Sequence, residues 1–322
     1  MLNILITSVG RRYKLIEYFK KEFFHSDNII LTDCDEFAPA LKLGDKQYIV
    51  PRIESEDYIN KLVEICLKEE ISAIFSLIDP EQVLLSKYKP LFDDIGVKLI
   101  SSRYEINELC LDKYKMYQFC INNKIQCAKT YLTVEDFIRD LEKKEVSFPI
   151  IVKPRFGSAS FGVTIVENLA ELNVVFLKRK DLIIQHFLKG QEFGVDCFTD
   201  LISKEIISIF IKEKIKMRAG ETDKAISVKD DRLVAFVSSI IYKLDLIGMV
   251  DIDVFNISGE WYLSEINPRF GGGYPLAYEC GQNYPKYIKN NLNGVTNDVN
   301  IGGYKENIVM AKFDDLLIYE IK

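Results

Sequence analysis

The chain has 322 residues, a formal net charge of −6 and 48% hydrophobic residues, a globular composition that excludes bulk disorder and predicts two or three structural units. The acidic charge balance argues against nucleic-acid binding through a broad basic surface. The only histidines are His25 and His186, which excludes a metal site built from several imidazoles, so any chemistry must use carboxylates, lysines, arginines and the backbone.

The first hundred residues alternate between short apolar segments and segments with helical spacing. Strands are expected at 3–7, 28–32, 72–77 and 97–100, and helices at 12–24, 55–69 and 80–88. This alternation predicts a parallel sheet with helices on its faces. Loops at the carboxyl ends of such strands tend to hold ligands, and here they contain residues 8–12, 33–35 and 79–81.

The pattern changes near residue 105. A helix is expected at 105–123, strands at 150–153, 161–166 and 182–187, and a helix at 169–178. Longer strands follow at 192–199, 205–216, 249–255 and 260–266, with one amphipathic helix at 232–244. We therefore expect an α/β front domain over 1–108, a small α+β lobe over 109–187 and a larger lobe over 188–322.

The segment after the strand at 150–153 could hold an anion. The strand ends in Lys153, and a loop of small residues with Gly157 and Gly162 follows. Glycine and serine let backbone N–H groups approach an anion closely. Val163 occupies the position of the Walker lysine and a strand is expected next, so a Walker-type loop is not expected. A phosphate-binding turn and a plain β-hairpin with a flexible tip fit the loop about equally well.

The segment 182–192 carries an apolar strand into a short turn that presents Glu192. Its backbone could meet the edge of a base, with Glu192 accepting from ribose hydroxyls. An ordinary strand–turn–strand explains the same residues and is favoured on this segment alone.

Oxygen-bearing side chains gather in the segment 250–269. Asp251 and Asp253 share one face of a strand, and Glu265 and Asn267 share one face of the next, because side chains alternate along a strand. Carboxylate and amide oxygens suit Mg²⁺, so the segment predicts a hairpin that binds a hard divalent cation. A solvated acidic face is the alternative, and it fits less well because the neighbouring residues are apolar.

The turn of this hairpin decides whether the acids meet. We expect a three-residue loop at 257–259, which sets Asp251 opposite Glu265 and Asp253 opposite Leu263. A two-residue loop would place the acids on opposite faces.

The segment 212–229 is basic, with Lys212, Lys214, Lys216 and Arg218. It could clamp an anionic substrate or a transferred phosphate. A solvated strand edge that uses lysine against aggregation is equally compatible with these residues.

Taken together, these motifs resemble the ATP-grasp superfamily. The resemblance is carried by Lys113 in Leu-Asp-Lys-Tyr, Lys153 in Ile-Val-Lys-Pro, the loop 157–162, the segment 185–192 and the Glu-Ile-Asn-Pro-Arg segment 265–269, in this order and spacing. It is similar to stand-alone relatives of the carbamoyl-phosphate synthase large subunit and covers essentially the whole chain. It implies a front domain followed by a two-lobed ATP-grasp unit.

The resemblance also implies an ATP site. Its residues would be Lys113 and Lys153 at the phosphates, Gly157, Ser158, Ser160 and Gly162 in the loop that closes over them, Gln185, His186 and Leu188 at the adenine, and Glu192 at the ribose. Gln185 stands where a carboxylate is common in the family, which need not matter because the backbone reads most of the adenine.

Two Mg²⁺ ions, with Mn²⁺ as an alternative, are implied as well. The ligands would be Asp253, Glu265 and Asn267, although Asp251 competes for the first position. Catalytic roles would fall to Arg269, Arg218 and Lys153, which would stabilise the phosphoryl group during its transfer.

The implied reaction is ATP-dependent joining of a carboxylate to an amine through an acyl phosphate. A phosphotransferase that stops at a phosphorylated product is the second hypothesis, and a nucleotide-binding regulator without catalysis is a distant third. A single ATP-grasp unit without a glutaminase makes carbamoyl phosphate synthesis itself unexpected.

The substrates are expected to be a small carboxylate and a small amine. Residues 8–12 and 79–81, with 216–224 and the turn 271–274, are expected to shape their pocket. Arg11 and Arg12 could grip a carboxylate or phosphate through two parallel hydrogen bonds, although exposed arginines are more often only solvated.

No membrane partner is expected, because no stretch reaches about 18 uninterrupted apolar residues. No nucleic-acid partner is expected, because the chain is acidic. Seven scattered cysteines without a Cys-x-x-Cys motif predict buried thiols in the cytoplasm. A homodimer is the default expectation for the assembly.

Overall fold

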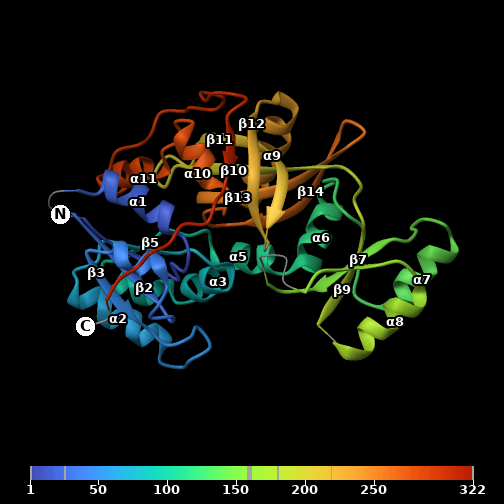
Figure 1. Ribbon diagram of the computed structural model, residues 1–322, viewed down its shortest axis with the longest axis horizontal. Coiled ribbons are helices and arrows are strands. Elements are labelled where there is room, and N and C mark those ends of the chain that lie inside the picture. Colours follow the sequence, from blue (N-terminus) through green and yellow to red (C-terminus); the bar gives the residue numbers. More distant parts are fainter. Residues whose placement is uncertain (1, 25–26, 158–161, 180, 219, 321–322) are drawn as a thin grey trace.

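The front of the chain folds into a parallel sheet (Figure 1). The structure is a computed structural model that describes residues 2–24, 27–157, 162–179, 181–218 and 220–320. Within this part, the first sheet has five parallel strands in the order β3-β2-β1-β4-β5. These strands are β1 (Asn3–Thr7), β2 (Asn28–Asp33), β3 (Lys46–Ile49), β4 (Ala73–Ser76) and β5 (Lys98–Leu99).

Helices cover both faces of this sheet, as the alternating pattern predicts. They are α1 (Tyr13–Glu22), the 3-10 helix η1 (Pro39–Leu43), α2 (Tyr58–Lys68), α3 (Asp79–Lys87) and α4 (Lys89–Asp94). Strand β3 is not expected from the sequence, because it is an edge strand whose side chains are mostly exposed and therefore lack an apolar pattern.

Two helices, α5 (Tyr104–Leu111) and α6 (Lys113–Asn122), link the front sheet to the rest of the chain. The single helix expected over 105–123 is therefore wrong. Asp112 ends the first helix in an extended conformation, and its side chain accepts the backbone N–H groups of Tyr114 and Lys115 at the start of the second. This side-chain cap replaces the continuous backbone ladder and fixes the first residue of α6, Lys113.

The small lobe is a four-stranded antiparallel sheet in the order β6-β9-β7-β8, counted over the described residues. Its strands are β6 (Thr130–Tyr131), β7 (Ile150–Pro154), β8 (Thr164–Val166) and β9 (Leu182–His186), and its helices are α7 (Val134–Glu142) and α8 (Leu169–Lys178). In Figure 1 this lobe projects away from the front sheet, and it has a hydrophobic cluster of its own.

The large lobe is built on an antiparallel sheet in the order β14-β13-β10-β11-β12-β15, again within the described chain. The strands are β10 (Gln191–Thr199), β11 (Ile206–Arg218), β12 (Glu221–Val228), β13 (Gly248–Ile257), β14 (Glu260–Asn267) and β15 (Val309–Ala311). Helix α9 (Asp231–Leu244) packs on one face, while α10 (Tyr274–Glu279) and α11 (Tyr284–Leu292) lie on the side of the front sheet. Strands β12 and β15 are additions to the expected set.

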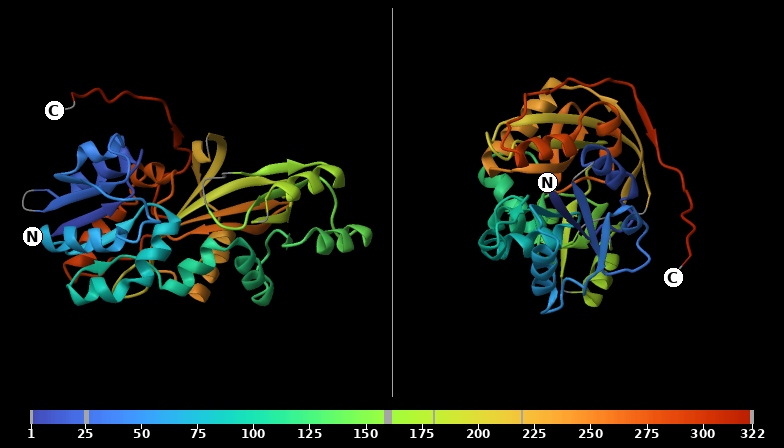
Figure 2. Two further views of the ribbon diagram at one scale, coloured as in Figure 1. Left: turned by 90° about the horizontal axis from the view of Figure 1, so that it is seen from below. Right: turned by 90° about the vertical axis from the view of Figure 1, so that its left-hand side faces the viewer.

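One hydrophobic cluster joins the front sheet to the large lobe. Phe19 of α1 and Phe75 of β4 contact Phe270, which in turn contacts Tyr274 of α10. The chain then runs back along the front sheet after β15 (Figure 2). The expected fold class, a parallel front sheet followed by a two-lobed α/β and α+β unit, is confirmed. Among the helices of the described residues, none is long and apolar enough to cross a bilayer.

Candidate active site

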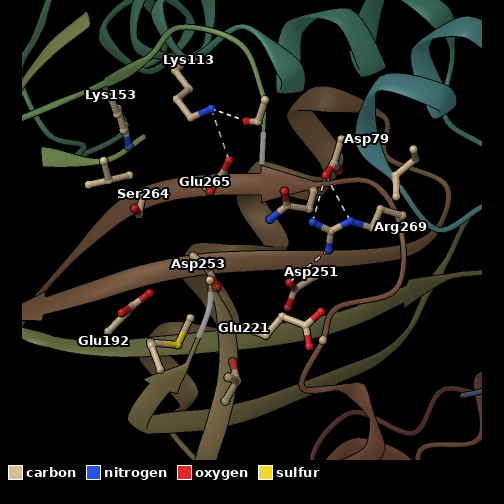
Figure 3. A pocket seen from close by; sticks show the side chains of 18 of the residues that line it. Asp79, Lys113, Lys153, Glu192, Glu221, Asp251, Asp253, Ser264, Glu265 and Arg269 are labelled. Carbon is tan, nitrogen blue, oxygen red and sulfur yellow. Dashed lines mark hydrogen bonds and ion pairs between the residues drawn. The ribbon is translucent and has the colours of Figure 1, made fainter. Parts of the chain in front are cut away.

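A pocket of about 450 Å³ lies where the three sheets meet. Its lining comes from the loops after β1 and β4, the start of α6, the strands β7 and β9, the turn between β11 and β12, and the hairpin β13–β14. Most of the residues expected to bind ligands converge there (Figure 3).

The hairpin turn differs from expectation. Ile257 pairs with Glu260, so the loop has two residues, Ser258 and Gly259, with φ angles of 53° and 88°. Two positive φ angles are typical of a tight hairpin turn that follows the natural strand twist. The three-residue loop predicted at 257–259 is therefore wrong.

The acids nevertheless share one surface, because the hairpin contains a β-bulge. Asp253 pairs with Glu265 while Val254 pairs with Leu263, so Ser264 is the extra residue. Beyond the bulge, Asp251 lies opposite Asn267. A two-residue loop alone would place the acids of the two strands on opposite faces. The inserted residue shifts the register by one and returns them to the same face. The pairings expected for Asp251 and Asp253 are thus wrong, although the predicted common face is correct.

Two lysines of β11 lie beneath these acids. Lys212 is buried and forms ion pairs with Asp196 (2.5 Å) and Asp251 (3.4 Å). Lys214 forms ion pairs with Asp253 (2.6 Å) and Glu192 (2.8 Å) and lines the pocket. The basic segment is thus not a solvated strand edge at these two positions, although Lys216 remains exposed.

Room for the two lysines comes from Gly194 on the neighbouring strand β10, where a Cβ atom would lie 2.9 Å from Lys212 Cε and 3.2 Å from Lys214 Cε. Burial alone would lower the pKa of Lys214, but Asp253 and Glu192 more than offset it and raise the pKa above its ordinary value.

One end of the pocket, which we call the phosphate end, is defined by Lys113, Lys153, Lys214, Asp253 and Glu265. Lys113 Nζ donates to the carbonyl of Gly157 and lies 3.7 Å from a Glu265 carboxylate oxygen (Figure 3). Burial lowers the pKa of Lys153. The charge of Glu265 opposes this shift, and the charge of Lys113 adds to it. Lys113 and Lys153 offer positive charge to an anion here, and a Cβ atom at Gly157, whose φ is 107°, would meet no described residue within 4 Å.

An ion pair fixes the position of Lys113. Arg155 follows β7 and donates from Nε and Nη2 to the two carboxylate oxygens of Asp112, at 2.8 and 2.6 Å. The backbone N–H of Lys113 also donates to the carbonyl of Arg155. The first residue of α6 is thereby tied to the strand that carries Lys153.

The strand β9 and its exit line the pocket beside this end. Gln185, His186, Leu188 and Glu192 all border it, and the Gln185 side chain donates to Thr130 Oγ1. The apolar lining residues that sequence reasoning missed include Ile151 and Phe255. Each is two positions from a lining residue on its own strand, Lys153 or Asp253, so period-two alternation was the available signal.

The other end, which we call the front end, is defined by residues 8–12, Asp79, Glu221 and Arg269. Arg269 is buried, and its Nε and Nη2 atoms donate to one Asp79 oxygen at 3.2 and 2.9 Å. Its Nη1 atom donates to the carbonyl of Phe270 and lies 3.6 Å from Asp251. Asp79 is the first residue of α3, so this contact joins the front sheet to the hairpin (Figure 3).

The two arginines of the loop after β1 differ. Arg11 is exposed, whereas the Arg12 side chain is 22% exposed and lies 3.7 Å from Glu221. Burial lowers the pKa of Arg12, and Glu221 opposes that shift. Both line the pocket, but only Arg12 is substantially withdrawn from water.

Some predicted residues lie elsewhere. Arg218 is not among the lining residues; it is half-exposed and pairs with Asp223 and Asp314 on the outer side of the β11–β12 turn. A role for it at the phosphoryl group is therefore not supported by its position. Ser158 and Ser160 lie outside the described residues. Gly162, with φ 72°, packs near Arg179 and Pro154 rather than lining the pocket.

The oxygen donors fit a magnesium ion. Asp253 and Glu265 face each other across the hairpin, Asn267 follows on the same surface, and all three line the pocket next to the lysines. Among the described residues, no three His, Cys, Asp or Glu side chains gather as a metal site by themselves. Two carboxylates and an amide match the few protein ligands that Mg²⁺ takes when phosphates supply the rest.

Comparison with known families divides the chain in the same way as its sheets do. Residues 4–100 match the family described as "PylC-like, N-terminal domain", and residues 110–273 match the family described as "ATP-grasp domain". The second match contains the phosphate end, the hairpin and Arg269.

Among curated relatives, the chain is 30% identical to a D-alanine–D-alanine ligase of Campylobacter concisus, over 70% of this chain and 69% of that protein. It is 23% identical to a carbamoyl-phosphate synthase of Methanobrevibacter smithii, over 58% of this chain. The match spans 49% of that synthase, and only 23% of the carbamoyl phosphate synthase large chain of Clostridium botulinum.

Solved structures share the fold at low identity. N5-carboxyaminoimidazole synthetase from Staphylococcus aureus, complexed with ADP, superposes with a TM-score of 0.74 at 17% identity, covering 92% of this chain and 78% of that one. The biotin carboxylase domain of a Hydrogenobacter thermophilus 2-oxoglutarate carboxylase, with MgADP, gives 0.76 at 14%, covering 96% and 73%. The chain therefore belongs to the ATP-grasp family, with a PylC-like N-terminal domain in front of its ATP-grasp domain.

Proposed function

We propose that this protein is an ATP-dependent carboxylate–amine ligase. It would activate a substrate carboxylate as an acyl phosphate and join it to an amine, releasing ADP and phosphate. The observation that carries the proposal is the pocket itself, which brings lysines and paired carboxylates at one end into the same cavity as arginines at the other. Relatives named as ligases support the same reaction class.

Nucleotide binding is assigned to the phosphate end and to β9. Lys113 and Lys153 contact the phosphates. The loop 157–162, expected to cover them, lies outside the described residues at 158–161. Gln185, His186 and Leu188 border the adenine, between the apolar side chains of Ile151 and Phe255, and Glu192 accepts from the ribose.

Asp253, Glu265 and Asn267 are assigned as ligands of two Mg²⁺ ions. Mg²⁺ bound there would neutralise phosphate charge. Several lysines supply part of the same positive charge. Lys214 holds Asp253 in place through its ion pair, so the ligand is oriented before the ion arrives.

In the first step, an oxygen of the substrate carboxylate attacks the γ-phosphorus, and the bond from that phosphorus to the β,γ-bridging oxygen breaks. ADP departs, and a mixed anhydride remains. Lys153, Lys113 and Arg269 offset the charge on the group in transfer, which is the main demand of phosphoryl transfer. Closure of the glycine loop keeps water from the anhydride.

In the second step, the amine nitrogen attacks the acyl carbon, and the bond from this carbon to the phosphate oxygen breaks. The departing phosphate takes a proton from the amine nitrogen and leaves as hydrogen phosphate, which gives a neutral amide. Arg269 is held by Asp79 and Asp251, so its guanidinium is fixed where the two substrates would meet.

The three units proposed for these roles are 1–108, which shapes the substrate end, 109–187, which carries the glycine loop, and 188–322, which carries the metal ligands. The cluster of apolar side chains shared by the first and third units supports movement of the small lobe alone.

A cytoplasmic homodimer is part of the proposal. All seven cysteines are free thiols, as expected in a reducing compartment. The biotin carboxylase domain from Hydrogenobacter thermophilus is a dimer, which supports a dimer here. Light scattering after size-exclusion chromatography and fractionation of the source cells test the two statements.

The function is tested by a screen of ADP release. Twenty L-amino acids and simple mono- and dicarboxylates serve as carboxylates, and ammonium and the same amino acids serve as amines, each with MgATP. Mass spectrometry then identifies the product. We expect an amide for at least one pair. A stable phosphorylated carboxylate with no amide from any amine would point to a phosphotransferase instead.

A further inference from the structure

The front end of the pocket coincides with the point where the strand order of the front sheet reverses. The chain passes from β1 to β2 and β3 on one side and then crosses to β4 on the other side of β1. Loops that leave two such strands diverge and open a crevice, which is where parallel sheets bind ligands. Here the two loops are residues 8–12 and 77–79, and both line the pocket.

Arg12 and Arg269, the two arginines at this crevice that are largely shielded from solvent, differ in the hydrogen bonds that their N–H groups make. Arg269 donates through Nε, Nη1 and Nη2 to Asp79 and to the carbonyl of Phe270. The Arg12 side chain makes no hydrogen bond to any described residue. Its ion-pair partner, Glu221, lies at 3.7 Å, which is too long for a hydrogen bond.

Glu221 is also engaged by another residue. Lys312 Nζ donates to its Oε2 atom at 3.0 Å, so Glu221 has a closer partner than Arg12. Arg12 thus has five N–H donors with no hydrogen-bond acceptor among the described residues, although its side chain is only 22% exposed. A guanidinium in this state is costly unless a further acceptor joins it.

Gly272 keeps the space around Arg12 open. A Cβ atom at this position would lie 3.0 Å from Arg12 Nη1 and 3.3 Å from Glu221 Cδ. The glycine belongs to the turn that follows Arg269, where it allows the backbone of the large lobe to pass close to the guanidinium.

We propose that Arg12 is a specificity determinant that binds an anionic group, a carboxylate or a phosphate, carried by one of the two substrates apart from its reacting group. This inference rests on the proposed ligase function and narrows it to a substrate with a second oxyanion. The planar fork of arginine matches a carboxylate through two parallel hydrogen bonds, and it also accepts a phosphate.

The competing explanation is that Arg12 only clamps the front sheet to β12 through Glu221. The two roles predict different behaviour. A clamp is lost equally when either partner is neutralised, whereas an anion site depends on Arg12 and not on Glu221.

The test compares acidic substrates with neutral analogues of similar shape. The probes are L-aspartate and L-asparagine, L-glutamate and L-glutamine, succinate and succinamate, and O-phospho-L-serine and L-serine, each titrated with MgATP and the amines of the screen. The value of kcat/KM from ADP release is measured for the wild type, Arg12→Gln, Arg12→Lys and Glu221→Gln. Arg139→Gln, an exposed arginine on α7, is the matched control.

We expect at least one acid to exceed its neutral analogue by about tenfold or more in the wild type, and Arg12→Gln to reduce that preference to about threefold or less. Arg12→Lys should keep part of the preference, and Glu221→Gln and Arg139→Gln most of it. KM for ATP should stay close to that of the wild type in Arg12→Gln. The phosphoserine pair and the carboxylate pairs identify which oxyanion is bound.

The inference is overturned if the wild type releases ADP in the screen but prefers no acid of these pairs. It is also overturned if Arg12→Gln lowers both members of a pair equally, or if Glu221→Gln removes the preference as completely. A wild type that releases no ADP in any reaction overturns the proposed function and this inference together, so the two failures are distinguishable.

Discussion

The two ends of the pocket carry the same sign of charge on different side chains. The cations at the phosphate end are Lys113, Lys153 and Lys214, and those at the front end are Arg11, Arg12 and Arg269. A lysine is a compact point charge with three donors that can follow a phosphate as it moves, whereas an arginine offers a rigid planar fork. This difference matches the proposal that the front end binds an oxyanion at a fixed position, while the lysines of the phosphate end follow the group in transfer.

The two ends also differ in how their cations are held. Lys214 and Lys113 are paired with carboxylates of the hairpin and β10, within the ATP-grasp domain. Arg269 of the large lobe pairs with Asp79, the first residue of α3 in the front domain. Arg12 of the front domain pairs with Glu221 of β12 in the large lobe. Chemistry at the front end therefore depends on the packing of the front sheet on the large lobe.

The largest expected effect concerns Lys212, a lysine that is buried beneath the acids and does not line the pocket. Lys212→Met would leave Asp196 and Asp251 without their shared cation, and breaking a buried pair costs about 3–5 kcal/mol. We expect a loss of this size in the free energy of unfolding, measured by urea denaturation. Lys216→Met, at an exposed position on the same strand, is the control. Equal losses in both variants would contradict the structural role of Lys212.

The burial of Lys212 also marks a limit of sequence reasoning. Strict alternation would place Lys212, Lys214 and Lys216 on one face of β11, but the pairing with β12 shifts between Lys214 and Lys216. The sequence shows neither this shift nor which strands lie beside the lysines. Only Gly194 and Asp196 on the paired strand β10 show that the face is enclosed at the first two positions. Long-range strand order decides this, and local spacing carries no signal of it.

The hairpin shows a second limit of prediction from the sequence. Period two predicts only that Asp251 and Asp253 share a face of one strand and that Glu265 and Asn267 share a face of the next. Their common face was expected from a three-residue loop that the structure does not have. The register that produces the common face was not predictable, because it depends on a β-bulge at Ser264. A serine in a strand gives no signal of an extra residue. At the front end, Arg11 and Arg12 were indistinguishable in sequence, and only the approach of β12 and Gly272 separates them.

A second prediction tests the phosphate end. Glu265→Gln keeps the shape of the side chain but removes a charged oxygen ligand, and charge stabilisation by a bound metal is worth several kcal/mol. We expect ADP release to fall by about two orders of magnitude or more, with the midpoint of thermal unfolding nearly unchanged. Glu260→Gln, at an exposed position of the same strand, serves as the control. Wild-type turnover by folded Glu265→Gln would rule out the metal assignment.

A third prediction tests the front end with a change that preserves charge. Arg269→Lys retains a cation but cannot donate in parallel to Asp79 and also reach Phe270. We expect ligation to fall by about tenfold to a hundredfold, since each hydrogen bond to a charged group contributes about 1.5–3 kcal/mol. Arg103→Lys, in an exposed pair with Asp245, is the control. If Arg269→Lys ligates as fast as the wild type, the fork geometry has no role.

A fourth prediction uses pH to separate the two ends. Burial lowers the pKa of Lys153 from its ordinary value of 10.5, so this ammonium loses its proton earlier than a free lysine as pH rises. Because the charged form binds phosphate, kcat/KM for ATP should fall on the alkaline side at a pH below 10.5, by up to about tenfold per pH unit beyond the pKa. Arginine stays protonated over this range, so the affinity for the substrate held at the front end, measured without ATP, should not fall with it.

Lys153→Arg is the matched variant for this profile. It should lower activity, because an arginine fork does not reproduce the lysine contact, but it should remove the alkaline fall in kcat/KM for ATP. Persistence of the same fall in Lys153→Arg would mean that another group titrates. Parallel falls for both substrates in the wild type would contradict the distinction between the two ends.

The smallest expected effect is at His186, the only histidine among the described residues that borders the pocket. Its side chain is exposed, while its backbone N–H donates to the carbonyl of Lys129 and its strand pairs with β7. His186→Ala preserves these backbone contacts, so KM for ATP should rise by no more than about threefold, within the usual range for surface substitutions. Complete loss of activity in a folded variant would make the imidazole essential. The pocket would then not operate on fixed lysines, arginines and oxygen ligands alone, and the contrast between its two ends would no longer account for the chemistry.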